Sequence, residues 1–256
     1  MPSMIAFSRV TKQYGDIVAL SDVTFTVSPK ECICITGPAK AGKSTLIRLL
    51  LRAEAPQKGS ISIDTVDVQL VPQAVLPLYR QRIGLKLTEG NLFLRKTVTG
   101  NLTFPLALRG IAERDCSRTA RNMMERLGLL HSADSLPADL TAEAQTLLGL
   151  GRALISNPMI LLLDEPFVDL SLDAFTLAVS LITEAHQSGK TTICCTRDES
   201  SASALGARHI RIAAGKIIDD NPPVSGDTTP SLSSTIHNIL ARALLHRRGP
   251  SAKEKE

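Results

Sequence analysis

Gly37-Pro-Ala-Lys-Ala-Gly-Lys-Ser44 matches the pattern G-x-x-x-x-G-K-[ST], in which backbone amides curl around phosphate groups. The apolar run Cys32–Thr36 precedes this loop, and a helical pattern, Thr45–Leu51, follows it. A strand, a glycine-rich loop and a helix in this order direct the helix N-terminus, which carries a positive dipole end, towards the phosphates. The stretch therefore predicts an α/β fold that binds a nucleotide.

Each part of this loop has an expected task. Gly37 and Gly42 let backbone N–H groups turn inward around phosphate oxygens. Lys43 is expected to reach the outer phosphates of ATP, and the Ser44 hydroxyl is expected to ligate Mg²⁺. The residues of this segment predicted to bind the nucleotide are Gly37, Pro38, Ala39, Lys40, Ala41, Gly42, Lys43, Ser44 and Thr45.

A second motif, Ile160-Leu-Leu-Leu-Asp-Glu-Pro166, is an apolar strand that ends in two carboxylates. Asp164 is placed to hold Mg²⁺ together with Ser44, and Glu165 is placed to polarise an attacking water. A nucleotide hydrolase needs both roles. The acidic pair alone is also typical of a strand that ends in a polar turn, but in combination with the phosphate loop it predicts the catalytic half of an ATP site.

Composition limits the remaining possibilities. The chain has 256 residues, 43% of them hydrophobic and 21% charged, as expected for one large globular domain with a small appendage. The net charge of +4 is mild, and an aromatic content of 3% with no Trp argues against a base-stacking nucleic-acid surface. We expect no transmembrane helix and no signal peptide, and we expect the five cysteines to be buried small hydrophobic residues rather than metal or redox groups.

Strand and helix patterns alternate along the chain, which predicts a mostly parallel sheet covered on both faces. Strands are expected on both sides of the turn Tyr14-Gly-Asp16, and the middle of the chain, about 75–140, is expected to be helical. The other predicted elements are strands at 59–64, 159–163 and 191–196, helices at 118–127, 142–156 and 173–188, a hairpin across Ala214-Gly215, a linker from 221, and a helix at 233–246.

Both motifs, the helical segment between them and Tyr14-Gly-Asp16 resemble an ABC-transporter ATP-binding subunit over residues 4–220. The resemblance implies a P-loop NTPase with a RecA-like core, an antiparallel β subdomain and an α-helical subdomain inserted at about 85–155, followed by a linker, a short helix and a charged tail at 221–256. It implies that Tyr14 stacks on adenine, although a surface turn tyrosine is the alternative. It also implies Mg²⁺-bound ATP sandwiched between two subunits of a homodimer or heterodimer.

The signature motif of this family, L-S-G-G-x-Q, is altered in this chain. It reads Leu140-Thr-Ala-Glu-Ala-Gln145, so that Ala142 and Glu143 replace both glycines. Their Cβ atoms occupy positions where the backbone should approach the partner subunit's γ-phosphate. The Glu143 carboxylate would repel that phosphate unless the side chain turns away.

Three further positions differ from the family pattern. Thr88 replaces a glutamine that reaches Mg²⁺ and the attacking water, and Arg197 replaces a histidine. Arg197, the second catalytic residue that we predict beside Glu165, can donate to a γ-phosphate but cannot exchange protons at neutral pH. Either Leu170-Ser171 or Leu172-Asp173 stands for the usual L-D pair. These changes predict tight ATP binding with slow or absent hydrolysis; ordinary turnover that uses Arg197 and Thr141 is the alternative.

Two branches of the family share local sequence with this chain. The segments 50–59, 76–84 and 96–106 resemble the FtsE branch, which implies signalling through an FtsX-like permease to cell-wall hydrolases during cell division. The segments 89–93 and 164–168 resemble MlaF-type phospholipid-transport ATPases, which pair with an MlaE-like permease. A third possibility is a non-hydrolysing subunit in which ATP is a structural ligand.

Both branches imply a cytoplasmic subunit held on the cytoplasmic face of the inner membrane by its permease. The resemblance places the permease contact on the segment from Thr88 to Phe104. Charged residues in or next to this segment make a partly ionic contact the expectation, and these residues are Lys86, Glu89, Arg95 and Lys96.

Overall fold

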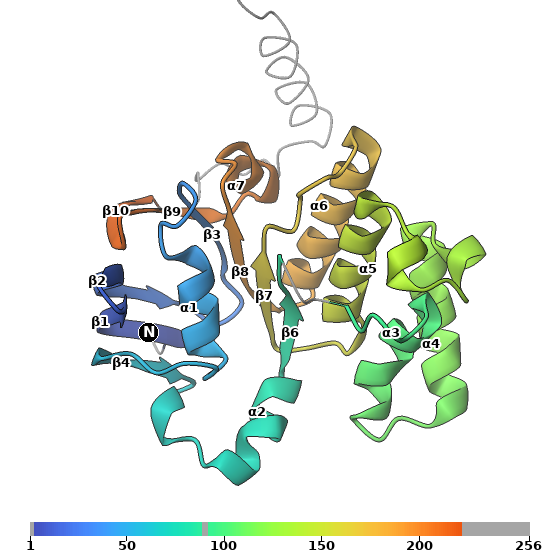
Figure 1. The fold of residues 1–256 in the computed structure, drawn as a ribbon, viewed down its shortest axis with the longest axis horizontal. Helices are drawn as coiled ribbons and strands as arrows, with labels where there is room; N and C mark the ends of the chain where they lie inside the picture. The colour runs from blue at the N-terminus through green and yellow to red at the C-terminus, as the bar shows by residue number, and fades with distance from the viewer. Residues whose placement is uncertain (1–2, 89–91, 222–256) are drawn as a thin grey trace, which may run out of the picture.

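The structure, a computed structural model, describes residues 3–88 and 92–221. Glu89, the predicted linker from residue 222, the predicted helix at 233–246 and the charged tail lie outside the described residues. The two sequence motifs lie on one six-stranded sheet, in the strand order β10-β9-β3-β8-β7-β6 (Figure 1). Its strands are β3 (Cys32–Thr36), β6 (Ile83–Lys86), β7 (Ile160–Asp164), β8 (Thr191–Thr196), β9 (Arg208–Ala213) and β10 (Lys216–Asn221).

The centre of this sheet is parallel and buried on both faces. β3 pairs in parallel with β8 and β9, and β7 pairs in parallel with β8 and β6, whereas β10 is antiparallel to β9. Alternate residues of β7 enter two separate cores: Ile160 and Leu162 face one, and Leu161 and Leu163 face the other. Such continuous apolar strands are expected where both faces of a parallel sheet are covered. The parallel register brings the ends of β3, β7 and β8 to one edge.

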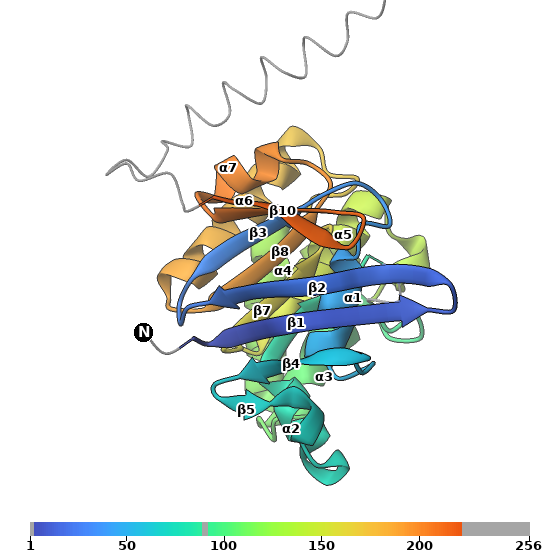
Figure 2. The same ribbon diagram turned by 90° about the vertical axis from the view of Figure 1, so that its left-hand side faces the viewer.

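A second sheet, antiparallel and in the order β2-β1-β4-β5, packs over α1 (Lys43–Leu50). Figure 2 shows the long β1–β2 hairpin crossing in front of the molecule. Phe7 and Phe25 stack at a centroid distance of 4.6 Å within the core shared by the two sheets and α1. The strands are β1 (Ile5–Tyr14), β2 (Ile17–Val27), β4 (Lys58–Ile63) and β5 (Val66–Asp67).

Helices cover the opposite face of the six-stranded sheet, and α3, α4 and α5 form a lobe at one side (Figure 1). α3 packs against both α4 and α5, so this lobe has its own helix–helix contacts. The remaining helices are α2 (Leu76–Gln81), α3 (Val98–Ala107), α4 (Glu113–Leu127), α5 (Ala142–Ile155), α6 (Leu172–Gln187) and α7 (Ser200–Leu205). Single 3₁₀ turns lie at Val68–Leu70, Gln73–Val75, Leu130–Ser132 and Pro137–Asp139.

Most of the predicted elements are present. The helix expected at 142–156 is α5, with Thr141 as its N-cap, and the helix expected at 173–188 is α6. α4 ends where predicted, at Gly128 with φ of 69°. The strands around Tyr14-Gly-Asp16 and the hairpin across Ala214-Gly215 are also confirmed.

The prediction that residues 75–140 are helical is wrong at Ile83–Lys86. This segment is β6, which pairs in parallel with β7 and forms the edge of the six-stranded sheet. A four-residue segment that contains a glycine is too short for a stable helix, and β7 offers it unpaired backbone groups. The helices of the lobe therefore begin after Lys86.

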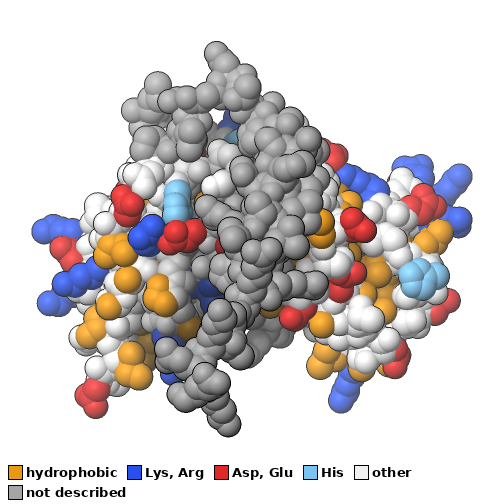
Figure 3. Space-filling view, turned by 90° about the horizontal axis from the view of Figure 1, so that it is seen from above, with side chains coloured by type: hydrophobic (Ala, Val, Ile, Leu, Met, Phe, Trp, Pro, Cys, Tyr) orange, Lys and Arg blue, Asp and Glu red, His pale blue; other side chains and the backbone are white. Residues whose placement is uncertain are grey.

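The five cysteines are free and buried, as predicted. Among the described residues, no helix is both long enough and apolar enough to cross a bilayer. Figure 3 shows basic and acidic side chains mixed at both ends of the face it draws, over the β strands at one side and the helical lobe at the other.

Candidate nucleotide-binding site

A cavity of about 500 Å³ opens where the carboxyl ends of the parallel strands meet the tip of the β1–β2 hairpin. It brings together most of the residues that the two motifs predict. Its lining consists of Tyr14, Ile17, Ala19, Ala39, Lys40, Ala41, Gly42, Lys43, Ser44, Thr45, Arg48, Leu87, Thr88, Asp164, Glu165 and Arg197. Of the predicted residues, Gly37 and Pro38 do not line this cavity.

The two glycines of the phosphate loop are required by close backbone contacts. A Cβ atom on Gly37 would lie 2.0 Å from the carbonyl oxygen of Ile212, and one on Gly42 would lie 2.4 Å from that of Ala19. Gly42 also has φ of 107°, in the region that side chains disfavour. Glycine thus lets the loop pack tightly against β2 and β9 at the mouth of the cavity.

Lys43 is the cation at the base of the loop, and its residue is only 6% exposed. Its Nζ donates to the carbonyl oxygens of Gly37 at 2.6 Å and Pro38 at 3.0 Å. Burial lowers the pKa of Lys43, and the carboxylate of Glu165 opposes this shift. The ammonium is therefore held inside the loop by two neutral acceptors, which a phosphate oxygen can replace with a stronger ionic partner.

Ser44 and Asp164 meet although they are far apart in the sequence. The Ser44 hydroxyl donates to Oδ2 of Asp164 at 2.9 Å, and Asp164 is 4% exposed. Two hard oxygen donors side by side fit Mg²⁺, which prefers oxygen ligands and completes its shell with water and substrate phosphates. Among residues 3–88 and 92–221 no cluster of three or more His, Cys, Asp or Glu could hold a metal ion.

Glu165 is held by three donors from the end of β8. Its Oε2 accepts from the Thr196 hydroxyl and the Arg197 N–H, each at 3.2 Å, and Arg197 Nε lies 3.4 Å from Oε1. Glu165 has φ of 46°, the left-handed conformation that is uncommon for a residue with a side chain. The two residues predicted as catalytic thus form an ion pair at the cavity wall.

Tyr14 lies at the far edge of the cavity, at the end of β1. Its hydroxyl donates to the Glu54 carboxylate, and the Lys12 ammonium lies 5.1 Å from the ring centroid. Burial, together with this hydrogen bond, raises the pKa of Tyr14. The hydrogen bond of the phenol fixes the position of the ring. The residue is 38% exposed. Its stacking on adenine remains a prediction.

Lys86 is a residue of this region whose place we did not foresee. The expectation that it belongs to the permease contact is wrong, because it is 2% exposed and turned inward. Its Nζ donates to the backbone oxygens of Asp164 at 3.1 Å and Glu165 at 2.6 Å. Burial lowers the pKa of Lys86 to about 8, opposed by the two carboxylates. The feature of the sequence that could have revealed this buried position is a lysine among the apolar residues of Ile83–Leu87.

The Glu143 side chain is turned towards the start of α6. Its Oε2 accepts from the backbone N–H of Ser171 at 2.7 Å, and this contact lowers the pKa of Glu143. The carboxylate is thereby placed at the N-terminus of α6, where a negative charge is favourable. Ser171 directly follows Leu170 and is the N-cap of α6, so Leu170-Ser171 stands before the helix while Asp173 lies within its first turn.

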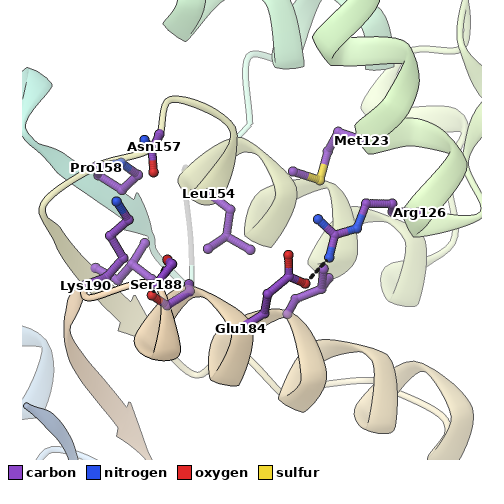
Figure 4. Close-up of a pocket in the computed structure, with 11 residues that line it drawn as sticks. Met123, Arg126, Leu154, Asn157, Pro158, Glu184, Ser188 and Lys190 are labelled. Carbon is purple, nitrogen blue, oxygen red and sulfur yellow. Dashed lines mark hydrogen bonds and ion pairs between the residues drawn. The ribbon is translucent and has the colours of Figure 1, made fainter. Parts of the chain in front are cut away.

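A second cavity, of about 190 Å³, lies between α4, α5 and α6 (Figure 4). Its lining includes Leu154, Leu161 and Leu181. An ion pair between Arg126 and Glu184 joins the helical lobe to α6 (Figure 4). Neither the phosphate loop nor the acidic pair lines this cavity. Among the described residues, the phosphate loop and the acidic pair meet at the first cavity.

The fold and the first cavity together define a P-loop nucleotide-binding domain, with its phosphate loop between β3 and α1 and its acidic pair at the end of β7. The sequence profile of the ABC transporter family matches residues 20–168. The chain belongs to the ABC transporter family.

Several characterised proteins are similar along most of this chain. The glutamate transport ATP-binding protein GluA of Corynebacterium glutamicum is 30% identical over 95% of the chain and all of its own length. The cell division ATP-binding protein FtsE of Escherichia coli is 32% identical over 84% of the chain and 97% of its own length. Two solved dimeric structures of the ABC cassette MJ0796, one with ADP and phosphate, cover 87% of the chain with a TM-score of 0.81 at 24% and 25% identity.

Proposed function

We propose that this chain is the ATP-binding subunit of a membrane ABC complex, and that it holds Mg²⁺-bound ATP but hydrolyses it slowly. The observation that carries the proposal is the content of the first cavity. The loop for phosphate and the oxygen pair for Mg²⁺ are complete, whereas Thr88 and Arg197 stand where the family uses glutamine and histidine. Binding and turnover depend on different residues of this cavity, so they can be altered separately.

The proposed roles follow from the contacts. Lys43 and the loop amides bind the phosphates, Ser44 and Asp164 hold Mg²⁺, and Tyr14 supports adenine. Mg²⁺, when bound, neutralises charge that develops on the phosphates. Glu165 orients the attacking water, but it must first give up the ion pair to Arg197, since a paired carboxylate is a weaker base. With no group at Thr88 long enough to place the water, the step is slow.

Comparison of ATP affinity with ATP turnover tests this proposal. The purified chain is expected to bind Mg²⁺-ATP in calorimetry, while sustained phosphate release stays at least about 100-fold below the roughly 10 turnovers per second of a median enzyme. Glu165→Gln is the matched control, because it removes the carboxylate and keeps the shape. Rapid phosphate release that disappears in Glu165→Gln would refute slow hydrolysis while leaving ATP binding intact.

For the complex itself we propose an FtsE-like subunit that works as a dimer with an FtsX-like permease, on the cytoplasmic face of the inner membrane, in cell division. The similarity to FtsE supports this assignment, and the dimeric MJ0796 cassettes support pairing. The similarity to GluA supports a second candidate, an uptake system in which the same ATP site drives transport of a solute. A role in phospholipid transport stays a prediction of the sequence.

We place the permease contact on the loop Leu92–Thr97, ahead of α3. The side chain of Asn101, fully buried, fixes this loop by accepting from the Phe93 N–H and donating to three of its carbonyls. Leu94 is 70% exposed beside Arg95, and Lys96 lies over the Phe104 ring at 5.0 Å. A rigid, exposed tip with apolar and basic groups suits docking against a membrane protein.

Charge reversal at this loop is expected to weaken the complex. Arg95→Glu with Lys96→Glu should lower co-purification with an FtsX-like permease from detergent-solubilised membranes by about tenfold. The basic side chains are expected to face acidic groups of the permease, which the introduced glutamates would repel. Lys58→Glu with Lys216→Glu, two exposed lysines on the β sheets, serves as the matched control. Equal recovery of the two double variants would move the contact elsewhere.

A further inference from the structure

Lys86 is a buried cation next to the acidic pair for which the roles above give no task. Its register partner on β7 is Leu163, so its side chain runs beside the point where Asp164 and Glu165 leave the sheet. The ammonium donates to both of their backbone oxygens, at 3.1 and 2.6 Å. Neither bond is to a carboxylate, so Lys86 acts on the course of the backbone and not directly on the nucleotide.

A cation in this position is expensive. Lys86 is 2% exposed, and an ammonium taken from water requires compensation by hydrogen bonds and nearby negative charge. Here the compensation consists of the two carbonyl bonds and the fields of Asp164, Glu165 and Asp169. An apolar side chain would fill the same space on β6 without that cost. The cost of burying the ammonium is therefore linked to the backbone conformation that its bonds to Asp164 and Glu165 stabilise.

What they hold is an unusual turn. Glu165 has φ of 46°, and in this conformation its carboxylate meets the Thr196 hydroxyl, the Arg197 N–H and the Arg197 guanidinium. A left-handed residue with a side chain persists only where its surroundings fix it. The surroundings here are these three contacts, two backbone hydrogen bonds of Glu165 itself, from its N–H to the Cys195 oxygen at 2.8 Å and from the Val168 N–H to its oxygen at 3.5 Å, and the ammonium of Lys86.

We propose that Lys86 is a positioning residue, which fixes the left-handed turn at Glu165 through the carbonyl oxygens of Asp164 and Glu165 and so aims the Glu165 carboxylate at the nucleotide cavity. The proposal rests on the proposed function in one respect, the role of Glu165 towards water. The placement of the turn is independent of the rate at which ATP is cleaved.

The test compares two variants of the full chain. Lys86→Met removes the donor and keeps a stem of similar length, and Lys86→Gln keeps a neutral N–H donor. A crystal structure of Lys86→Met is expected to show Glu165 outside the left-handed region, with its contacts to Thr196 and Arg197 lost. If Lys86→Met fails to fold, the structure of Lys86→Gln is determined instead. Its left-handed turn at Glu165 is expected to be retained only if the new side-chain amide donates to the backbone oxygen of Asp164 or Glu165. An unchanged turn in a variant that makes no such bond overturns the proposal.

Kinetics provide the second readout. With the chain in excess over labelled Mg²⁺-ATP, Lys86→Met is expected to slow the single-turnover cleavage about tenfold and to change the ATP dissociation constant by less than about threefold. In a Glu165→Gln background the same substitution should have no further effect. Equal fractional losses in both backgrounds, or affinity that falls together with the rate, would mean a general structural role and would overturn the proposal.

The outcomes separate the two proposals. Fast turnover by the unaltered chain would refute slow hydrolysis, and the Lys86 proposal would still be decided by the turn at Glu165. A turn that stays left-handed without Lys86 would refute the positioning role, and the affinity and turnover of the unaltered chain would still decide the proposed function.

Discussion

A chain that carries Lys43→Ala is expected to bind Mg²⁺-ATP at least about 100-fold more weakly than the unaltered chain. The ammonium already lies inside the loop, with its two bonds to the oxygens of Gly37 and Pro38 ready for exchange. A hydrogen bond to a charged group contributes about 1.5–3 kcal/mol, and two of them to a polyphosphate correspond to a factor of about 10² to 10⁴ in affinity. Calorimetric titration with ATP measures this loss directly.

The control for Lys43→Ala is Lys58→Ala, the same change at an exposed position of β4. Its ATP affinity is expected to match that of the unaltered chain. Lys43→Ala also leaves the Gly37 and Pro38 oxygens without their donor, so its thermal midpoint has to be recorded beside its affinity. Retention of ATP affinity within about fivefold in a folded Lys43→Ala chain would contradict the assignment of the phosphate loop.

The second large effect is a gain in ATP turnover. Combining Thr88→Gln, Ala142→Gly, Glu143→Gly and Arg197→His restores the family residue at four of the altered positions, and steady-state phosphate release is expected to rise at least about 100-fold. The four changes act on different parts of one reaction. The glutamine places water, the histidine frees Glu165 from its ion pair with Arg197, and the glycines open the signature to the partner's phosphate.

Each of the four substitutions alone is expected to raise turnover only a few-fold, because groups that act as a unit are not additive. The same quadruple variant with Glu165→Gln is the control and should be inactive. Glu143→Gly removes the contact to Ser171 at the start of α6, so stability must be compared as well. A folded quadruple variant that is no faster than the unaltered chain would show that slow turnover has another cause.

The sequence predicted which residues of the two motifs lie together at one cavity, because both motifs depend on local chemistry. A phosphate loop needs glycines at fixed spacing, which the pattern Gly37 to Ser44 shows directly. The meeting of Ser44 and Asp164 follows from parallel pairing, which brings strand ends to one edge. These features could be inferred without coordinates.

Features that depend on side-chain direction could not be inferred. Glu143 follows an N-cap at the start of a helix, and only the packing of α5 against α6 decides that its carboxylate reaches Ser171 and not the partner's phosphate. The sequence predicts a surface charge at Lys86 because it predicts a helical region that includes the segment Ile83–Lys86, which is in fact a strand. The error in secondary structure and the error in burial therefore have the same origin, the unrecognised pairing of β6 with β7.

The left-handed turn at Glu165 also has a consequence for the evolution of this protein. At φ of 46° a glycine or an asparagine would relieve backbone strain, which is of the order of 1–3 kcal/mol for such residues. Selection for stability alone would therefore tend to erase the carboxylate. A drift of position 165 towards glycine or asparagine among descendants of this chain would mark lineages in which cleavage of ATP is no longer under selection, whereas retained glutamate would mark lineages that still depend on it.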